Sequence, residues 1–146
     1  MINCIIFVLK PSHYEVLREL LLLIKAEDYR WSVGDSDIYA LPSLENILTK
    51  GNYHGQEIIE ALNQKIFYVF SEFFAFKTSN IAPPKSYKEL LESDCEIAIF
   101  IVDSDYYSVY VKNDALFDSV KRFVSESDCI RSEVINNENA SLYFGI

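Results

Sequence analysis

Residues 86–112 constrain the fold of this chain more than any other segment. The segment opens with a Ser followed three residues later by a Glu, a pairing that caps the start of a helix. Residues 97–102 are uniformly apolar, which indicates a strand inside a sheet. The turn-forming residues 103–105 and an alternating run over 106–111 then predict a second strand with one face exposed to water. The segment thus reads as helix, strand, turn and strand.

This segment also carries a concentrated negative charge. No Lys or Arg occurs between Glu89 and Val111, whereas six carboxylates do: Glu89, Glu92, Asp94, Glu96, Asp103 and Asp105. Several tyrosines lie among them. The segment therefore predicts a structural unit with an acidic, tyrosine-rich rim, and it contains no recognisable reaction chemistry.

The remaining chain alternates apolar strands with amphipathic helices. Strands are expected over residues 2–9, 29–33, 38–41 and 65–77, and a closing hairpin over 131–135 and 141–144. Helices are expected after a capping box formed by Ser12 and Glu15, and over residues 56–63 and 114–126. Residues 43–54 are ambiguous. The pattern predicts one α+β domain over residues 1–146, with a mostly antiparallel sheet of about five to seven strands and three to four helices packed on it.

The net charge of −9 bears on the kind of partner. An acidic surface repels nucleic-acid phosphates, and Lys121-Arg122 is the one adjacent basic pair. We therefore expect no nucleic-acid partner, and a basic protein, a cation or a neutral ligand is favoured. The acidic excess is equally compatible with ordinary cytosolic solubility.

The three cysteines, Cys4, Cys95 and Cys129, have no metal-binding or redox spacing and are expected to be free thiols. The apolar N-terminus lacks the basic start and the cleavage pattern of a signal peptide, and no apolar run is long enough to span a bilayer. These features predict a cytoplasmic protein without membrane contact.

The sequence lacks the common catalytic motifs. It has no phosphate-binding glycine loop, no nucleophile elbow and no zinc-protease helix, and its two histidines, His13 and His54, are expected on the surface. Two Asp-Ser-Asp triplets, residues 35–37 and 103–105, place two carboxylates close together, a pairing that can share a hard cation. Each lies where a strand is expected to end, however, so a turn is the favoured interpretation. We expect no enzyme activity, metal or cofactor.

Aromatic residues beside these acidic turns suggest a protein interface. Rigid aromatic anchors inside a charged rim are typical of interfaces with a basic partner. The alternative is that most of the tyrosines pack in the sheet, and Trp31 is expected in the core. The residues predicted to contact a partner are Asp35, Asp37, Asp94, Asp103, Asp105, Tyr106 and Tyr110.

Several stretches resemble a family of small, acidic, uncharacterised bacterial proteins that occur mainly in spore-forming Gram-positive bacteria. They are the Tyr-x-Trp-x-x-Gly stretch 29–34, the strand 65–70, and residues 86–95, which end in Glu-Ser-Asp-Cys and lead to the turn after Val102. The resemblance implies a self-contained cytoplasmic domain and supplies no catalytic residues. By analogy, proteins of this size and acidity often serve as immunity proteins for secreted toxins.

The sequence thus favours a non-enzymatic, immunity- or antitoxin-type inhibitor of a basic toxin domain, with a nuclease as one candidate. A small-molecule-binding or sensor domain with an aromatic pocket is the alternative. A metal-dependent enzyme that uses an Asp-Ser-Asp pair is a third hypothesis, and it has the least support. The oligomeric state is left open.

Overall fold

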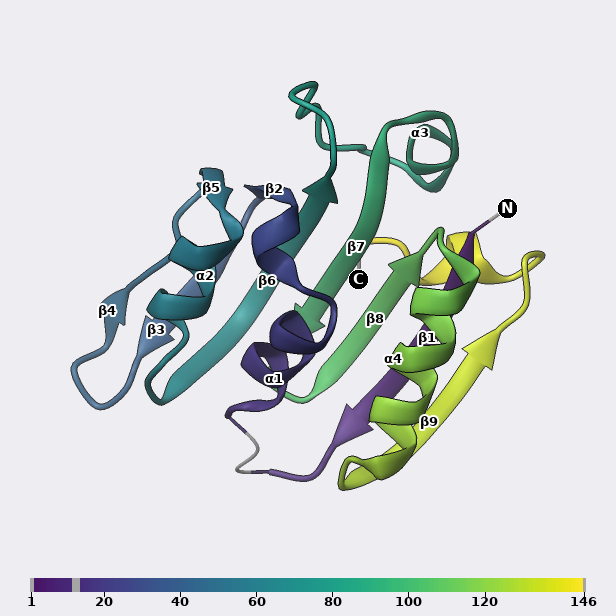
Figure 1. Cartoon of the computed structure of the whole chain (residues 1–146). Helices are drawn as coiled ribbons and strands as arrows, with labels where there is room; N and C mark the ends of the chain where they lie inside the picture. The colour runs from purple at the N-terminus through teal and green to yellow at the C-terminus, as the bar shows by residue number, and fades with distance from the viewer. Residues whose placement is uncertain (1, 12–13, 146) are drawn as a thin grey trace.

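One antiparallel sheet organises the molecule (Figure 1). The computed structural model describes residues 2–11 and 14–145. Within these ranges, four α-helices, two 3₁₀ helices and nine strands follow one another as β1 (Asn3–Leu9), α1 (Val16–Leu23), η1 (Ala26–Asp28), β2 (Arg30–Val33), β3 (Asp37–Ala40), β4 (Glu45–Asn46), β5 (Gly51–His54), α2 (Gly55–Ala61), β6 (Ile66–Phe76), α3 (Tyr87–Glu92), β7 (Cys95–Val102), β8 (Tyr106–Val111), α4 (Asp114–Glu126), β9 (Cys129–Ile135) and η2 (Ala140–Tyr143).

The strands lie in the order β4-β3-β6-β7-β8-β1-β9. The 11-residue strand β6 is long enough to pair with β3 along its first half and with β2 along its second half, and β5 lies beside β2. The α+β prediction is confirmed. The strand count exceeds the predicted five to seven, in part because the ambiguous residues 43–54 supply β4 and β5.

Three helices cover one face of the sheet. Figure 1 shows α1, α2 and α4 in front of the strands, where they bury the larger of two apolar clusters. Helix α4 begins and ends where the sequence predicts, because Asn113 caps its first turn and Phe117, Val120 and Val124 form its buried stripe. Trp31 lies in this cluster with no exposed surface, and its Nε1 donates to the Ala26 carbonyl at 2.9 Å. The prediction that Trp31 is a core residue is therefore confirmed.

The opposite face is covered over part of its area. There Cys4, Phe74 and Phe100 pack beneath α3 and the C-terminal residues that follow β9. The Tyr110 hydroxyl donates to the Ala140 carbonyl at 2.6 Å and so fastens η2 to the sheet. The ring of Phe144 lies 4.8 Å from that of Phe100.

The predicted C-terminal hairpin is wrong. Strand β9 pairs with β1, and residues 140–143 form η2 instead of a strand. The tail turns because it has an apolar surface to cover, where Ala140 is buried and Phe144 stacks on the sheet. The same tail overturns the expectation of one wet face on β8, since Ser108 and Tyr110 are buried and Tyr106 alone on that face is partly exposed.

The two predicted capping boxes have different outcomes. Ser12 and His13 lie outside the described residues, and α1 begins at Val16. Ser86 does accept the Glu89 N–H at 3.1 Å, but the Glu89 carboxylate accepts from the backbone of Lys85. Of the second capping box, the bond to Ser86 is present, and the bond from the Ser86 N–H to Glu89 is replaced by one from Lys85.

Candidate partner-binding surface

A row of exposed side chains crosses the second face of the sheet where its cover ends. Strand register places these residues side by side, because cross-strand partners point to the same face. The row runs through Asp37 of β3, Phe70 of β6, Val102 of β7, Tyr106 of β8, Val8 of β1 and Arg131 of β9. Every member is partly or fully exposed. The uncovered part of this face is therefore continuous across six strands.

The middle of the next row on the same face is closed. Phe100 and Ile6 belong to it, and they expose 0% and 1% of their surface. Beside the exposed row, Tyr39 and Phe67 form one further cross-strand pair, and Phe67 exposes 40% of its surface. We call the apolar and aromatic side chains of this uncovered area the open strip: Tyr39, Phe67, Phe70, Val102, Tyr106 and Val8.

The turn at residues 103–105 ends the open strip with two carboxylates. Asp103 and Ser104 have φ angles of 52° and 66°, and the Tyr68 N–H donates to Ser104 Oγ at 2.8 Å. The central serine thus anchors the turn to β6, and Asp103 and Asp105 flank it. The turn interpretation of this triplet is confirmed.

The triplet at residues 35–37 has the same design. Ser36 Oγ donates to the Leu48 carbonyl at 3.2 Å, while Asp35 and Asp37 are exposed on either side. Lys50 Nζ lies 3.3 Å from Asp35 Oδ1, a solvent-exposed ion pair. Since Asp37 and Val102 are both register partners of Phe70, the two acidic turns lie about 10 Å apart across β6.

Glu72 adds a half-buried carboxylate to this region. It pairs with Phe100, one row from the open strip. Burial raises its pKa, as does the nearby charge of Asp35, while the Asp35 N–H and Lys50 act in the opposite direction. Gly34 lies directly against this side chain, because a Cβ at position 34 would collide with the Glu72 carboxylate. The absence of a Cβ on Gly34 thus leaves room for the Glu72 carboxylate.

Two predicted contact residues lie elsewhere. Tyr110 is fully buried under η2, so it is not a surface residue and that prediction is corrected. Asp94 is exposed but follows α3 at the other end of β7, where it accepts from the Thr78 hydroxyl at 3.5 Å. The structure gathers the other five, Asp35, Asp37, Asp103, Asp105 and Tyr106, around the open strip.

The apolar members of the strip escaped sequence reasoning. Phe67, Phe70 and Val102 lie in apolar runs that read as fully buried strands. One cause is structural: β6 has a register shift opposite the step from Asp37 to Ile38, which leaves Val69 as an extra residue. Such bulges change which face a side chain points to, but they are not visible in a single sequence.

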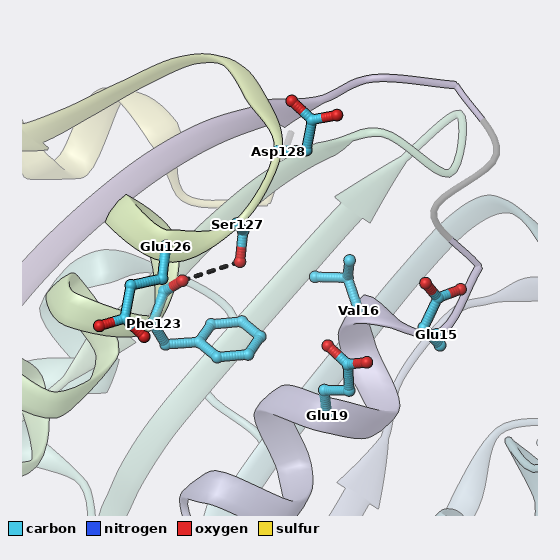
Figure 2. Close-up of a pocket in the computed structure, with 7 residues that line it drawn as sticks. All are labelled: Glu15, Val16, Glu19, Phe123, Glu126, Ser127 and Asp128. Carbon is cyan, nitrogen blue, oxygen red and sulfur yellow. Dashed lines mark hydrogen bonds between the residues drawn. The ribbon is translucent and has the colours of Figure 1, made fainter.

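An acidic pocket lies on the helix-covered face, between the start of α1 and the end of α4. Its volume is about 410 Å³, and Figure 2 shows its lining residues Glu15, Val16, Glu19, Phe123, Glu126, Ser127 and Asp128. Asp128 is paired with Lys10 at 2.7 Å, and the Ser127 hydroxyl donates to the Phe123 carbonyl at 2.8 Å. Acidic walls suit a cationic group in general and specify no particular ligand.

Within residues 2–11 and 14–145 no group of three or more His, Cys, Asp or Glu side chains is arranged to hold a metal ion. The cysteines are free thiols, as predicted. Burial raises the pKa of Cys4 and of Cys95 to about 12, so both stay protonated at neutral pH. No helix in the same part of the chain is long and apolar enough to cross a membrane.

Comparison with known proteins gives one family. The model of the family described as "Protein of unknown function (DUF2691)" matches residues 2–143. A curated relative, the uncharacterized protein YncE of Bacillus subtilis (strain 168), is 23% identical over 138 residues, which cover 88% of this chain and 89% of the relative. No solved structure matches. Because the family model spans nearly the whole chain, the protein belongs to this family of bacterial proteins, in line with the resemblance noted in the sequence.

Proposed function

We propose that this member of the family is a non-enzymatic protein-binding module, which inhibits a basic toxin domain in the manner of an immunity protein or antitoxin. The partner docks on the open strip and is oriented by the carboxylates around it. A nuclease domain fits this chemistry, since its active site is basic and carboxylates can stand where substrate phosphates would bind.

The observation that carries the proposal is the half-covered sheet face. Folding alone gives no reason to leave six apolar or aromatic side chains uncovered in one continuous area while Phe100 and Ile6 in the adjacent row are closed. Exposed apolar area rimmed by charge is the arrangement of a protein interface, in which aromatic side chains supply most of the binding energy.

Charge supports a basic partner. Four exposed or partly exposed aspartates, Asp35, Asp37, Asp103 and Asp105, surround the strip, and Glu72 lies one row away. Lys50 offsets one of them, and Arg131 lies at the opposite end of the row. With a net charge of −9 for the whole chain, association with a basic protein is accelerated by electrostatic steering and slowed by salt.

A matched pair of variants tests the placement. Asp103→Ala with Asp105→Ala removes two carboxylates at the strip, and Glu27→Ala with Glu60→Ala removes two exposed carboxylates from the helix-covered side at the same cost in net charge. The tagged proteins are used to capture partners from a lysate of the native host at about 50 mM and about 300 mM salt, with identification by mass spectrometry.

The proposal predicts a basic protein that wild type and the helix-side variant retain at low salt, and that the strip variant loses. Equal retention by both double variants would show that the acidic turns are not the contact. Inhibition of the captured protein's activity by wild type, and weaker inhibition by the strip variant, completes the assignment as an inhibitor.

A small-molecule-binding or sensor function is the second candidate, and one cavity favours it. A pocket of about 190 Å³ adjoins the turn at 103–105 and is lined by Lys10, Pro11, Tyr14, Ile66, Phe67, Tyr68, Asp103, Ser104 and Asp105. It combines aromatic walls with a cation and two acids, but it is smaller than the 300–1,000 Å³ typical of ligand pockets. A rise in melting temperature with a metabolite, lost in Phe67→Ala, would favour this alternative.

We further propose that the Tyr-x-Trp-x-x-Gly and Glu-Ser-Asp-Cys stretches are family signatures with structural roles. Trp31 is buried in the larger cluster and donates to Ala26 of η1, and Gly34 makes room for Glu72. Ser93 in the second stretch accepts the Cys95 N–H at 3.2 Å and donates to Leu90, so it joins α3 to β7. Both stretches hold the sheet that presents the strip.

A further inference from the structure

Strand β9 is an open sheet edge of unusual length. It runs over seven residues, Cys129–Ile135, and in the described part of the chain β1 is the strand that pairs with it (Figure 1). Sheet edges are normally protected by charged side chains, proline or shortness, because an unpaired row of N–H and C=O groups invites another strand. β4 and β5, beyond β3 and β2, have two and four residues.

The register shows which backbone groups face outward. The Leu9 N–H donates to the Asp105 carbonyl in β8 at 2.9 Å, so alternate residues of β1, beginning with Val8, direct their backbone toward β9. Val8 pairs with Arg131, which therefore uses its backbone toward β1. The same alternation leaves the N–H and C=O groups of Ser132 and Val134 directed to the open edge, while Ile130 is the extra residue at a register shift opposite the step from Val8 to Leu9.

The side chains of Ile130, Ser132 and Val134 do not protect the edge. Ile130 and Val134 expose 63% and 54% of their surface, and Ser132 between them is exposed. The side chains of Ser132 and Val134 lie on the helix-covered face, since Val134 pairs with the core residue Ile5. Arg131 and Glu133 lie on the other face and are exposed as well.

The sequence of this edge is complementary to itself. When two copies of β9 are set antiparallel about Ser132, Ile130 of one copy meets Val134 of the other, and Arg131 meets Glu133. Within residues 130–134 each apolar residue then faces an apolar residue, and each charge faces its opposite. The two-fold axis makes each of these pairs occur twice. Because Ser132 presents its backbone outward, the two-fold axis passes through a hydrogen-bonded pair, as antiparallel geometry requires for such pairing.

We propose that β9 is a homodimer interface, in which two chains pair antiparallel through Ser132 and join their sheets into one. This pairing uses the edge of β9 and not the open strip itself, but the two surfaces adjoin because Arg131 interacts with Tyr106. Pairing would bring the strips of two chains onto one continuous surface. Edge pairing over five residues buries less area than a standard interface, so the dimer is weak and forms at micromolar or higher concentration.

The test is the dimer dissociation constant from sedimentation equilibrium, up to about 1 mM protein. Ser132→Pro removes the outward N–H without touching the bonds to β1, so we expect a folded monomer, whereas Ser132→Ala should still dimerise. Arg131→Glu turns two attractive pairs into like-charge pairs and should weaken the dimer about tenfold or more. Glu133→Arg should do the same, and the double exchange should restore dimerisation.

Unchanged melting temperatures of the Arg131 and Glu133 variants at low protein concentration verify that the monomer fold is intact. A wild type that remains monomeric at the highest concentration would overturn the proposal. So would a dimer that survives Ser132→Pro, or a double charge exchange that fails to recover the dimer lost in the single variants.

Discussion

Two phenylalanines on the same sheet face differ in cover, and this difference predicts different contributions to stability. Phe100 has no exposed surface, and its ring lies 5.7, 6.0 and 4.8 Å from those of Phe74, Tyr110 and Phe144. Truncation of such a residue to alanine costs about 3–5 kcal/mol through lost transfer energy and the cavity left behind.

Phe67 belongs to the open strip and exposes 40% of its surface. Phe67→Ala removes the stabilisation from the buried part of the ring. The site is open to solvent, so no closed cavity forms, and the expected loss of unfolding free energy is about 1–2 kcal/mol. The free energy of unfolding of Phe100→Ala should therefore fall about 2 kcal/mol further than that of Phe67→Ala.

Urea titration followed by tryptophan fluorescence measures both costs, because Trp31 is fully buried and becomes exposed on unfolding. The comparison is made at low protein concentration, where self-association does not contribute. Equal losses in the two variants would mean that Phe67 is covered in solution, and the open strip would then not be a free surface.

Three further substitutions test particular contacts. Gly55→Ala should destabilise the protein by about 1–3 kcal/mol, because the added Cβ collides with a backbone carbonyl, while Gly51→Ala, whose nearest neighbour would be 3.8 Å away, serves as the control in the same urea titration. Tyr110→Phe leaves the Ala140 carbonyl without its donor and should cost about 1–3 kcal/mol, with faster amide hydrogen exchange in η2. Burial raises the pKa of Glu72, so its contribution to stability is present below its ordinary pKa and is lost as the pH rises through the folded value. At pH 7 the melting temperature of Glu72→Gln should therefore lie slightly above that of the wild type, and this difference should shrink toward pH 4. A difference that does not change with pH would contradict the raised pKa.

Local sequence patterns were sufficient where one segment makes its own structure. Residues 114–126 carry a cap and a helical stripe, and residues 97–102 are an unbroken apolar run, so α4 and the interior part of β7 could be predicted. The turn at residues 103–105 followed from its Asp and Ser content. Each of these features depends on neighbours a few residues apart.

Features that depend on distant parts of the chain could not be predicted from the sequence. The C-terminal segment looks like a strand, but an apolar area formed by Phe100 and Tyr110 turns it into a 3₁₀ helix with a docked tail. The open strip is the part of this face that η2 and Phe144 do not cover. Whether Phe70 or Phe100 is exposed depends on this boundary and on the bulge in β6, and neither is encoded near the residue itself.

The predicted contact residues include some that sequence reasoning could identify and one that it could not. Sequence reasoning selected Asp35, Asp37, Asp103 and Asp105, and the structure brings all four to one region, since β3 and β7 both pair with β6. Tyr110 was selected by the same reasoning and is buried, because alternation along β8 does not reveal which rows the tail covers.

Hydroxyl-radical footprinting of the captured complex against the free protein tests most directly whether the open strip binds a partner. Tyr39, Phe67 and Tyr106 should be oxidised in the free protein and protected in the complex, while Leu22, which exposes 46% of its surface on the helix-covered side, should react equally in both. Protection of Leu22 with unchanged oxidation of the strip would place the partner on the other face and contradict the proposed function.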